Sequence, residues 1–185
     1  MARPASATDR LPSNIPITVT MKPADDFIAV DDTAGLTLSV IGDTYRVVVS
    51  GEQTGGAFAV IDMLVPPQGG PGPHAHAGMQ ESFYVVDGEI VVKTKHQIYT
   101  ARKGSFVTIP LGGLVHEFKN TTATVAHLLC TVMPAGLEAF FKEIGQPVPA
   151  GTFLPPPPMG PEELQRLTRI AEKHGQKLFP ADDLD

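Results

Sequence analysis

Between residues 27 and 133 the sequence is a succession of short apolar segments separated by turn residues. Turn pairs such as Asp87-Gly88 and Lys103-Gly104 tolerate left-handed backbone dihedrals at little steric cost. So many short β segments predict an antiparallel barrel or sandwich rather than a parallel α/β sheet. The predicted strands are Phe27–Val30, Leu36–Ile41, Tyr45–Ser50, Ala57–Val65, Glu81–Val86, Ile90–Thr94, Gln97–Thr100, Ser105–Ile109, Leu114–Lys119 and Val125–Met133.

After residue 134 the apolar period changes to that of a helix. Leu137, Phe140, Phe141 and Ile144 fall at i, i+3, i+4 and i+7, which predicts one helix with an apolar stripe. A stiff Pro-rich connector follows over residues 147–158. A second helix is expected to begin at Pro161, with a buried stripe of Leu164, Leu167, Ile170 and Ala171.

These patterns divide the chain into three parts. Residues 1–23 are rich in Pro, Ser, Thr and Asp and predict a loose N-terminal arm. Residues 24–134 carry the β segments, and residues 135–185 are expected to form a helical extension packed outside them. At 185 residues the chain is long enough for one compact domain without disulfide support.

Composition excludes several classes of protein. The formal net charge of −6, without a cluster of basic residues, argues against a nucleic-acid partner. No window approaches the about 18 apolar residues of a membrane span, and the N-terminus has no apolar signal region, so we expect a cytoplasmic protein without a membrane partner. Cys130 is the only cysteine, which rules out an internal disulfide and predicts a buried, inert thiol.

The chemistry is concentrated in the segment 69–81. His74 and His76 are two residues apart, so an extended strand would project both imidazoles to the same side. Glu81 begins the next apolar strand, where a lone buried carboxylate would cost several kcal/mol. A bound metal cation would remove that penalty.

A third histidine, His116, begins a strand downstream after a Gly/Pro-rich turn at 110–113. Three imidazoles and one carboxylate suit Fe, Mn, Ni, Co, Cu or Zn better than Ca or Mg, which prefer oxygen ligands. Four ligands leave one or two coordination positions open, as in a catalytic or substrate-binding site. The sequence therefore predicts one divalent transition metal held by His74, His76, Glu81 and His116.

The same residues resemble the two cupin motifs. His74-x-His76-x4-Glu81-x6-Gly88 is similar to the first, and Gly104-x5-Pro110-x2-Gly113-x2-His116-x3-Asn120 is similar to the second. The resemblance implies an all-β fold, a jelly-roll antiparallel β-barrel, with these His and Glu residues as metal ligands. It also implies a homodimer, because single cupin barrels commonly dimerise.

A narrower resemblance points to single-domain quercetinase-like dioxygenases. It rests on the segments 71–76 and 81–89 and on the run Met133–Phe141. It implies a metal-dependent dioxygenase that takes an aromatic enol or flavonol-like substrate together with O2. Glu81 would then be both a ligand and the catalytic base for the substrate hydroxyl proton. The predicted pocket residues are Tyr45, Met63, Phe83, Val85, Phe118 and His127.

Other interpretations remain open at this point. His127 is also compatible with a core histidine, and an apolar lining suits an ordinary barrel core as well as a substrate pocket. A metal-dependent isomerase, decarboxylase or lyase of a small organic acid or sugar is a second possibility, and a pocket rich in Arg and Lys would favour it. A non-catalytic small-molecule-binding protein, or a cupin with an empty vestigial site, is a third.

Overall fold

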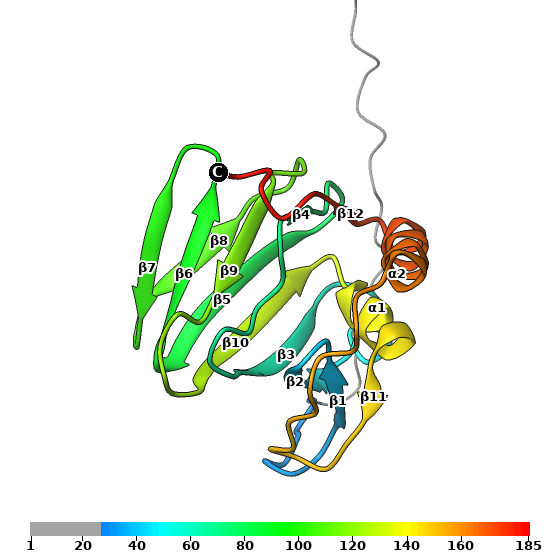
Figure 1. The fold of residues 1–185 in the computed structure, drawn as a ribbon. Coiled ribbons are helices and arrows are strands. Elements are labelled where there is room, and N and C mark those ends of the chain that lie inside the picture. The colour runs from blue at the N-terminus through cyan, green and yellow to red at the C-terminus, as the bar shows by residue number, and fades with distance from the viewer. Residues whose placement is uncertain (1–26) are drawn as a thin grey trace, which may run out of the picture.

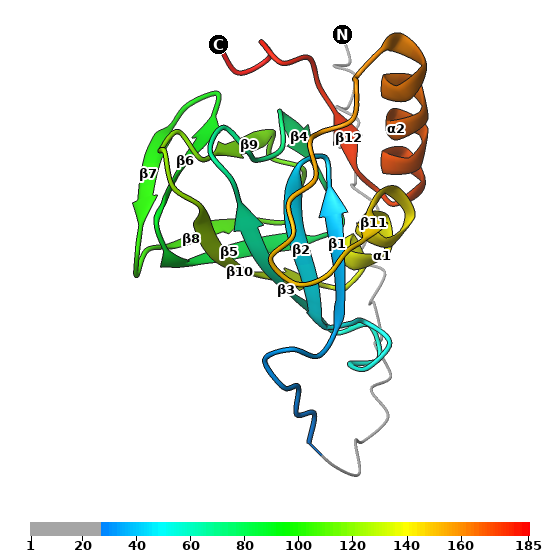
Figure 2. The same ribbon diagram turned by 60° about the horizontal axis from the view of Figure 1, so that its bottom comes forward.

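The computed structural model describes residues 27–185, so the predicted arm at 1–23 lies outside the described residues. Two antiparallel sheets pack face to face in a jelly-roll arrangement, and two helices lie against one end of them (Figures 1 and 2). The predicted all-β jelly-roll fold with helices outside is confirmed, and the described strands are divided between two sheets rather than joined into one closed barrel. No described helix has the length and apolar character needed to span a bilayer.

The larger sheet has seven strands in the order β11-β1-β2-β3-β10-β5-β8. Its members are β1 (Leu36–Val40), β2 (Asp43–Val49), β3 (Ala59–Val65), β5 (Gln80–Asp87), β8 (Phe106–Ile109), β10 (Ala126–Met133) and β11 (Gln146–Pro147). The smaller sheet has the order β12-β4-β9-β6-β7. Its members are β4 (His74–Ala75), β6 (Glu89–Thr94), β7 (Ile98–Arg102), β9 (His116–Lys119) and β12 (Lys177–Leu178).

The core lies between the sheets, where strand residues alternate between buried and partly exposed positions. In β3, Ile61 and Met63 point inward while Asp62 between them points outward. β10 pairs with β3 and β5 in the centre of the larger sheet, and Leu128 and Cys130 face inward from it. A strand with one face buried and one face partly exposed needs this two-residue period, so the register of the sheet is fixed by its apolar side.

The predicted strand at Phe27–Val30 is wrong, because those residues form no strand in the structure. They are largely exposed, so this short apolar run is not part of the core. The short strands β4, β11 and β12 were not predicted. Each has only two residues, which is too short for a periodic signal.

Both predicted helices are present, as α1 (Leu137–Ile144) and α2 (Pro161–Lys173). α1 buries Leu137, Phe140 and Phe141 against the sheet edge, and the Phe141 ring contacts Tyr45 edge-on with centroids 4.9 Å apart. On α2 the predicted stripe is only partly confirmed. Leu167 and Ala171 are buried, whereas Leu164 is half exposed.

Beyond α2 the chain returns to the smaller sheet (Figure 2). β12 pairs antiparallel with β4, with Leu178 opposite His74 and Lys177 opposite Ala75. The backbone N–H of Phe179 also donates to the carbonyl of Pro73. The segment after α2 is therefore attached to the strand that carries the first predicted metal ligand.

Candidate metal centre

Four buried side chains converge between the two sheets. His74 is the first residue of β4, and His76 directly follows that strand. Glu81 is the second residue of β5, and His116 is the first residue of β9. One ligand atom from each of the four lies within 4.8 Å of the others. The structure therefore brings together all four residues that the sequence predicted as a ligand set.

A close backbone approach places the first two histidines. Gly70 has a φ of 108°, and a Cβ at this position would lie 2.2 Å from the carbonyl oxygen of Phe118 in β9. Only glycine fits there without displacing the neighbouring strand. The loop therefore reaches β9 directly, and His74 pairs with His116 across the two strands.

The backbone orients each imidazole. The Nδ1 atoms of His74, His76 and His116 lie 2.9, 3.0 and 2.8 Å from carbonyl oxygens, and donation to these carbonyls leaves Nε2 as the unprotonated ring nitrogen. The carbonyl partners are, in that order, Gly72, Met79 and Leu114. Backbone acceptors of this kind fix the tautomer that metal ligation requires, and the sequence could not identify them.

The distances between ligand atoms fit a metal ion. His76 Nε2 and His116 Nε2 lie 3.1 and 3.3 Å from Glu81 Oε2. Adjacent ligands at about 2.0–2.2 Å from one ion, in tetrahedral or octahedral directions, are separated by about 2.8–3.6 Å. The donor set of three nitrogens and one oxygen suits a divalent transition metal. The residues present therefore fit the group that the cupin resemblance implies.

The surroundings of Glu81 and His74 shift the pKa values of both groups toward the protonation states that bind a cation. Burial raises the pKa of Glu81, but the contacts of its Oε2 with the His116 and His76 rings lower it well below its usual range overall. Burial lowers the pKa of His76, but the neighbouring Glu81 carboxylate raises it overall. Burial and the neighbouring His116 lower the pKa of His74 to about 4, so this ring is neutral at pH 7. A carboxylate and neutral imidazoles are the protonation states that bind a metal.

Cys130 contacts the second oxygen of the same carboxylate. Its Sγ lies 3.4 Å from Glu81 Oε1, and the thiol is fully buried. Burial raises the pKa of Cys130 well above its ordinary value, with a further contribution from Glu81, so the thiol stays protonated. The prediction of a buried thiol is confirmed, but its contact with Glu81 was missed. The alternation along β10 would have revealed it, because Cys130 shares its inward face with Leu128 and Val132.

A cavity of about 450 Å³ opens beside the cluster, and His74 and Glu81 form part of its wall. Its lining is mostly apolar, and none of the described residues that form it is Lys or Arg. The residues come from the inner sheet faces, the loop before β4, both helices and the segment after α2. They include Val40, Asp43, Tyr45, Met63, Pro71, Phe118, Leu137, Phe140, Phe141, Met159, Leu164, Leu167, Gln176, Leu178, Phe179 and Ala181.

Three of the six predicted pocket residues, Tyr45, Met63 and Phe118, line this cavity. Phe83 and Val85 do not. Both are completely buried on the inner face of β5, where Phe83 packs edge-on against the Phe118 ring at 5.0 Å. They share a face with Glu81, as predicted, but lie deeper in the core, so the prediction that they line the pocket is wrong.

His127 is also misplaced by the sequence prediction. It lies on the outer face of β10, and its Nε2 contacts Asp62 Oδ1 on the neighbouring strand β3. Asp62 in turn accepts hydrogen bonds from the Arg46 guanidinium at 2.8 and 3.3 Å. Since Leu128 and Cys130 face inward, the two-residue period places His127 away from the cavity.

Asp43 and Tyr45 form a buried polar pair on the cavity wall. The Tyr45 hydroxyl donates to Asp43 Oδ2 at 2.7 Å, and the backbone N–H of Gly70 lies 3.2 Å from both carboxyl oxygens. Burial raises the pKa of Asp43 to about 6, although the two hydrogen bonds oppose this shift. Asp43 was not predicted as a site residue.

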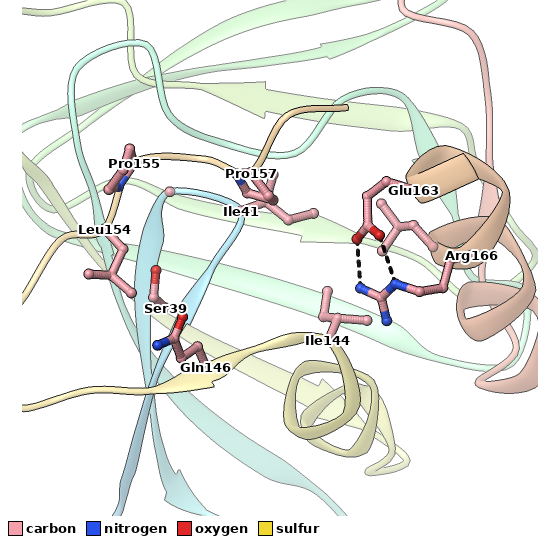
Figure 3. A pocket seen from close by; sticks show the side chains of 11 residues that line it. Ser39, Ile41, Ile144, Gln146, Leu154, Pro155, Pro157, Glu163 and Arg166 are labelled. Carbon is pink, nitrogen blue, oxygen red and sulfur yellow. Dashed lines mark hydrogen bonds and ion pairs between the residues drawn. The ribbon is translucent and has the colours of Figure 1, made fainter. Parts of the chain in front are cut away.

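A smaller cavity of about 220 Å³ lies under the Pro-rich connector (Figure 3). The ion pair between Glu163 and Arg166 of α2 borders it on one side, and Ser39 and Gln146 border it on another. Its lining includes no histidine and no cysteine. Metal-binding chemistry is therefore confined to the larger cavity among the described residues.

Comparison with known proteins agrees with this geometry. Residues 61–132, which contain the whole His/Glu cluster, match the family model described as Cupin domain. Over this segment the chain is similar to the cupin family. A structure of a predicted oxalate decarboxylase from Thermotoga maritima has the same fold, with a TM-score of 0.51 and 22% identity, over 58% of this chain and 99% of that chain.

Two further proteins resemble the chain over part of their length. Quercetin 2,3-dioxygenase from Bacillus subtilis (strain 168) is 26% identical over 128 residues, which are 69% of this chain and 36% of the relative. The chain therefore spans about a third of that protein. A sugar phosphate isomerase of the cupin superfamily from Silicibacter pomeroyi is 21% identical, with a TM-score of 0.46, over 51% of this chain and 61% of that chain.

Proposed function

We propose that this cupin is a metal-dependent dioxygenase of quercetinase type that acts on an aromatic enol or flavonol-like substrate. The observation that carries the proposal is the position of the His/His/Glu/His cluster in the wall of an apolar 450 Å³ cavity. A cavity of this size suits a ring-bearing organic molecule. The similarity to quercetin 2,3-dioxygenase supports the same reaction class.

His74, His76, Glu81 and His116 would hold one divalent transition metal. When bound, such an ion supplies Lewis-acid stabilisation of the deprotonated enol oxygen of the substrate. The protein would contribute a fixed set of imidazoles, because three backbone carbonyls hold the rings in the ligating tautomer. The identity of the metal depends on availability as well as on this donor set.

Glu81 would also accept the proton of the substrate hydroxyl. Its carboxyl group lies in the cavity wall and is ionised, because the neighbouring imidazoles keep its pKa low. A base must lie within hydrogen-bonding reach of the proton that it accepts, and a substrate hydroxyl directed at the cluster meets this condition. Oε2 lies close to His76 and His116, whereas Oε1 contacts only the weak donor Cys130. Oε1 is therefore the better acceptor for the proton.

The walls would hold the substrate and exclude water. Phe118, Phe140 and Phe141 supply aromatic surface on several sides of the cavity. Flat aromatic substrates gain from such contacts through burial and edge-to-face packing. Among the described residues no Lys or Arg lines the cavity, so a small anionic acid or sugar acid would find no charged side-chain donor there besides the proposed metal, and this disfavours that alternative.

The test is oxygen consumption by metal-loaded protein with 3-hydroxyflavone and quercetin, after metal analysis of protein purified without oxygen. We expect O2 uptake in proportion to metal content. Glu81→Gln should lower turnover by at least about a hundredfold, the range for loss of a general base. Asp62→Asn, the same change on the outer face, should leave turnover unchanged.

Metal content is measured on each variant so that ligation and base catalysis are separated. If Glu81→Gln keeps its metal and its turnover, the base role fails. If fully loaded wild-type protein consumes no O2 with any flavonol or related enol, the dioxygenase proposal fails, and an isomerase, lyase or binding function takes its place.

A further inference from the structure

Ile41 has a backbone conformation that β-branched residues rarely adopt. Its φ is 51°, and among the described residues Gln68 is the only other non-glycine residue with a positive φ. In this region the Cβ atom of an L-residue crowds the neighbouring backbone, and a branched side chain adds to the crowding. Residues held in such conformations gather at ligand-binding and catalytic sites, so this outlier calls for a functional explanation.

The hairpin turn between β1 and β2 imposes the conformation but not the side chain. Val40 pairs with Asp43, so Ile41 and Gly42 are the two loop residues, and Gly42 also has a positive φ of 100°. Two-residue hairpin loops of this kind strongly favour Asn, Asp or Gly, because these residues tolerate left-handed dihedrals. The turn therefore needs a positive φ at position 41, whereas an isoleucine there makes the turn less stable.

The Ile41 side chain lies where the two cavities adjoin. Ile41, Ile144 and Leu167 line both the cavity of about 450 Å³ beside the metal cluster and the smaller cavity of about 220 Å³. Ile144 ends α1 and Leu167 is buried on α2, so this boundary is built from two helices and one turn. Ile41 is 40% exposed, so it is not enclosed by protein atoms, and Figure 3 shows it reaching into the smaller cavity.

The two sides of this boundary differ in chemistry. On the metal side, Phe140 and Phe141 supply aromatic surface. On the other side, the ion pair of Glu163 and Arg166 borders a smaller space (Figure 3). An apolar ring gains from burial on the first side only, because contact with the second would take water away from charged groups. A ring-bearing molecule in the metal cavity therefore ends at Ile41.

The Pro-rich connector holds the turn in this place. A Cβ added to Gly42 would lie 3.4 Å from side-chain atoms of Pro156, and the Thr44 hydroxyl donates to the Thr152 carbonyl at 2.6 Å. A proline-rich segment is stiff, so the turn has little room to move outward beneath it. The side chain of Ile41 is therefore a fixed wall of the cavity.

We propose that Ile41 is a specificity-determining residue, whose side chain closes the metal cavity toward the smaller cavity and so limits the length of the substrate. This inference rests on the proposed function, since it concerns the substrate of the same cavity. It narrows the substrate class to aromatic molecules that end at this wall. Contact with the substrate offsets the stability that the isoleucine costs the turn, as in other sites where function and stability conflict.

Ligands of graded length test this assignment by equilibrium binding without oxygen, followed by fluorescence at a fixed and measured metal content. 3-Hydroxyflavone is the short ligand, and two longer ligands carry an additional phenyl group at either end, at C4′ or at C7. Ile41→Gly removes the wall and suits the turn. Gln68→Gly makes a matched change at the other positive φ, at an exposed residue that lines neither cavity, and is the control.

We expect the wild type to bind 3-hydroxyflavone more tightly than either longer ligand. Ile41→Gly should shift the ratio of dissociation constants in favour of at least one longer ligand by at least about tenfold, the lower end for pockets that discriminate by size. Gln68→Gly should leave both ratios unchanged. Without ligand, Ile41→Gly should melt at or above the temperature of the wild type, because glycine adopts a positive φ without strain.

The other outcomes are equally decisive. A melting temperature of Ile41→Gly clearly below that of the wild type would show that the isoleucine serves packing under the connector, and would overturn the inference. Unchanged ratios in Ile41→Gly, or a wild type that binds no 3-hydroxyflavone or prefers a longer ligand, also overturn it. O2 uptake with unchanged ratios rejects the role of Ile41 alone. Shifted ratios without any O2 uptake by the wild type reject the dioxygenase activity and leave the role of Ile41 intact.

Discussion

Histidine and carboxylate side chains meet on both faces of the larger sheet. Inside, Glu81 lies among three imidazoles and is 3% exposed. Outside, Asp62 contacts His127 and the guanidinium of Arg46, and its side chain is 20% exposed. The two carboxylates therefore share their neighbouring residue types but differ in burial and in the source of positive charge.

The difference shows what makes such a cluster a metal site. The outer carboxylate is neutralised by Arg46 and by water, so it needs no further cation. The inner carboxylate has no Lys or Arg within hydrogen-bonding distance among the described residues, and the imidazoles around it are turned by backbone carbonyls to present Nε2. A metal ion would balance the charge of the inner carboxylate, whereas Arg46 already does so for the outer one.

The largest expected effect is on metal content. His116→Ala removes an inner ligand, and we expect metal affinity to fall by more than the 10- to 100-fold that is typical for loss of an outer-shell partner. His127→Ala removes the outer histidine and should leave affinity unchanged. Metal titration with a competing chelator measures both. Equal losses in the two variants would show that the faces do not differ in this way.

Metal removal should destabilise the wild type strongly. A metal that binds only the folded state, present at a thousand times its dissociation constant, stabilises it by about 4 kcal/mol. For a chain of this size, that corresponds to a melting temperature about 8–16 °C higher in loaded than in metal-free protein. Calorimetry with and without chelator checks the shift. His116→Ala should show almost none, and a full shift in this variant would place the metal elsewhere.

Asp43 is a third carboxylate to set beside Glu81 and Asp62. It is buried, and its hydrogen-bond donors, the Tyr45 hydroxyl and the Gly70 N–H, are both neutral. Its pKa is about 6 in the folded protein against 3.8 for an ordinary aspartate, so the folded state binds its proton more tightly than the unfolded state. Stability from this group is therefore fully present below pH 3.8 and is lost as pH rises through 6. Relative to Asp43→Asn, the free energy of unfolding of the wild type should fall by up to about 3 kcal/mol between pH 4 and 7.

Denaturant titrations of the two metal-free proteins at several pH values provide this measurement. His74, His76 and Glu81 titrate in both proteins, so their contributions cancel in the difference. A difference that is flat with pH would mean that Asp43 is not protonated preferentially in the folded state.

The smallest effect is expected on the outer face. Asp62→Asn weakens the contacts with Arg46 and His127, both of which are partly exposed. Exposed ion pairs contribute about 0–1 kcal/mol, so the loss of stability should stay within this range and shrink further in high salt. A loss of several kcal/mol at 1 M salt would show that this cluster is a structural element as important as the inner one.

The fold and the ligand set could be predicted because they leave local signals. Alternating apolar residues mark the strands, and His74-x-His76 with Glu81 and His116 marks the motifs. The pocket lining could not be predicted in the same way. Phe83 and Glu81 share a face, but depth between the sheets, which periodicity does not encode, decides that only Glu81 reaches the cavity. The position of Gln176 in the cavity wall has no local signal in the sequence either, because it depends on β12 pairing with β4.

His127 illustrates a different kind of failure. The signal was present, because Leu128 and Cys130 determine the inner face of β10 and the neighbouring odd position must face outward. The sheet has a register irregularity between His127 and Leu128, and the strand still keeps its alternation beyond it. A stricter use of the two-residue period would have paired His127 with Asp62 rather than with the substrate.

The pairing of β4 also has a consequence for how the protein acquires its site. This two-residue strand is held by β9 on one side and by β12 on the other, and β12 lies about a hundred residues later in the chain. Contacts between such distant residues form slowly, because a long loop must close before they contribute. His74 should therefore be the last ligand to become ordered during folding, after the central strands of the larger sheet have already assembled.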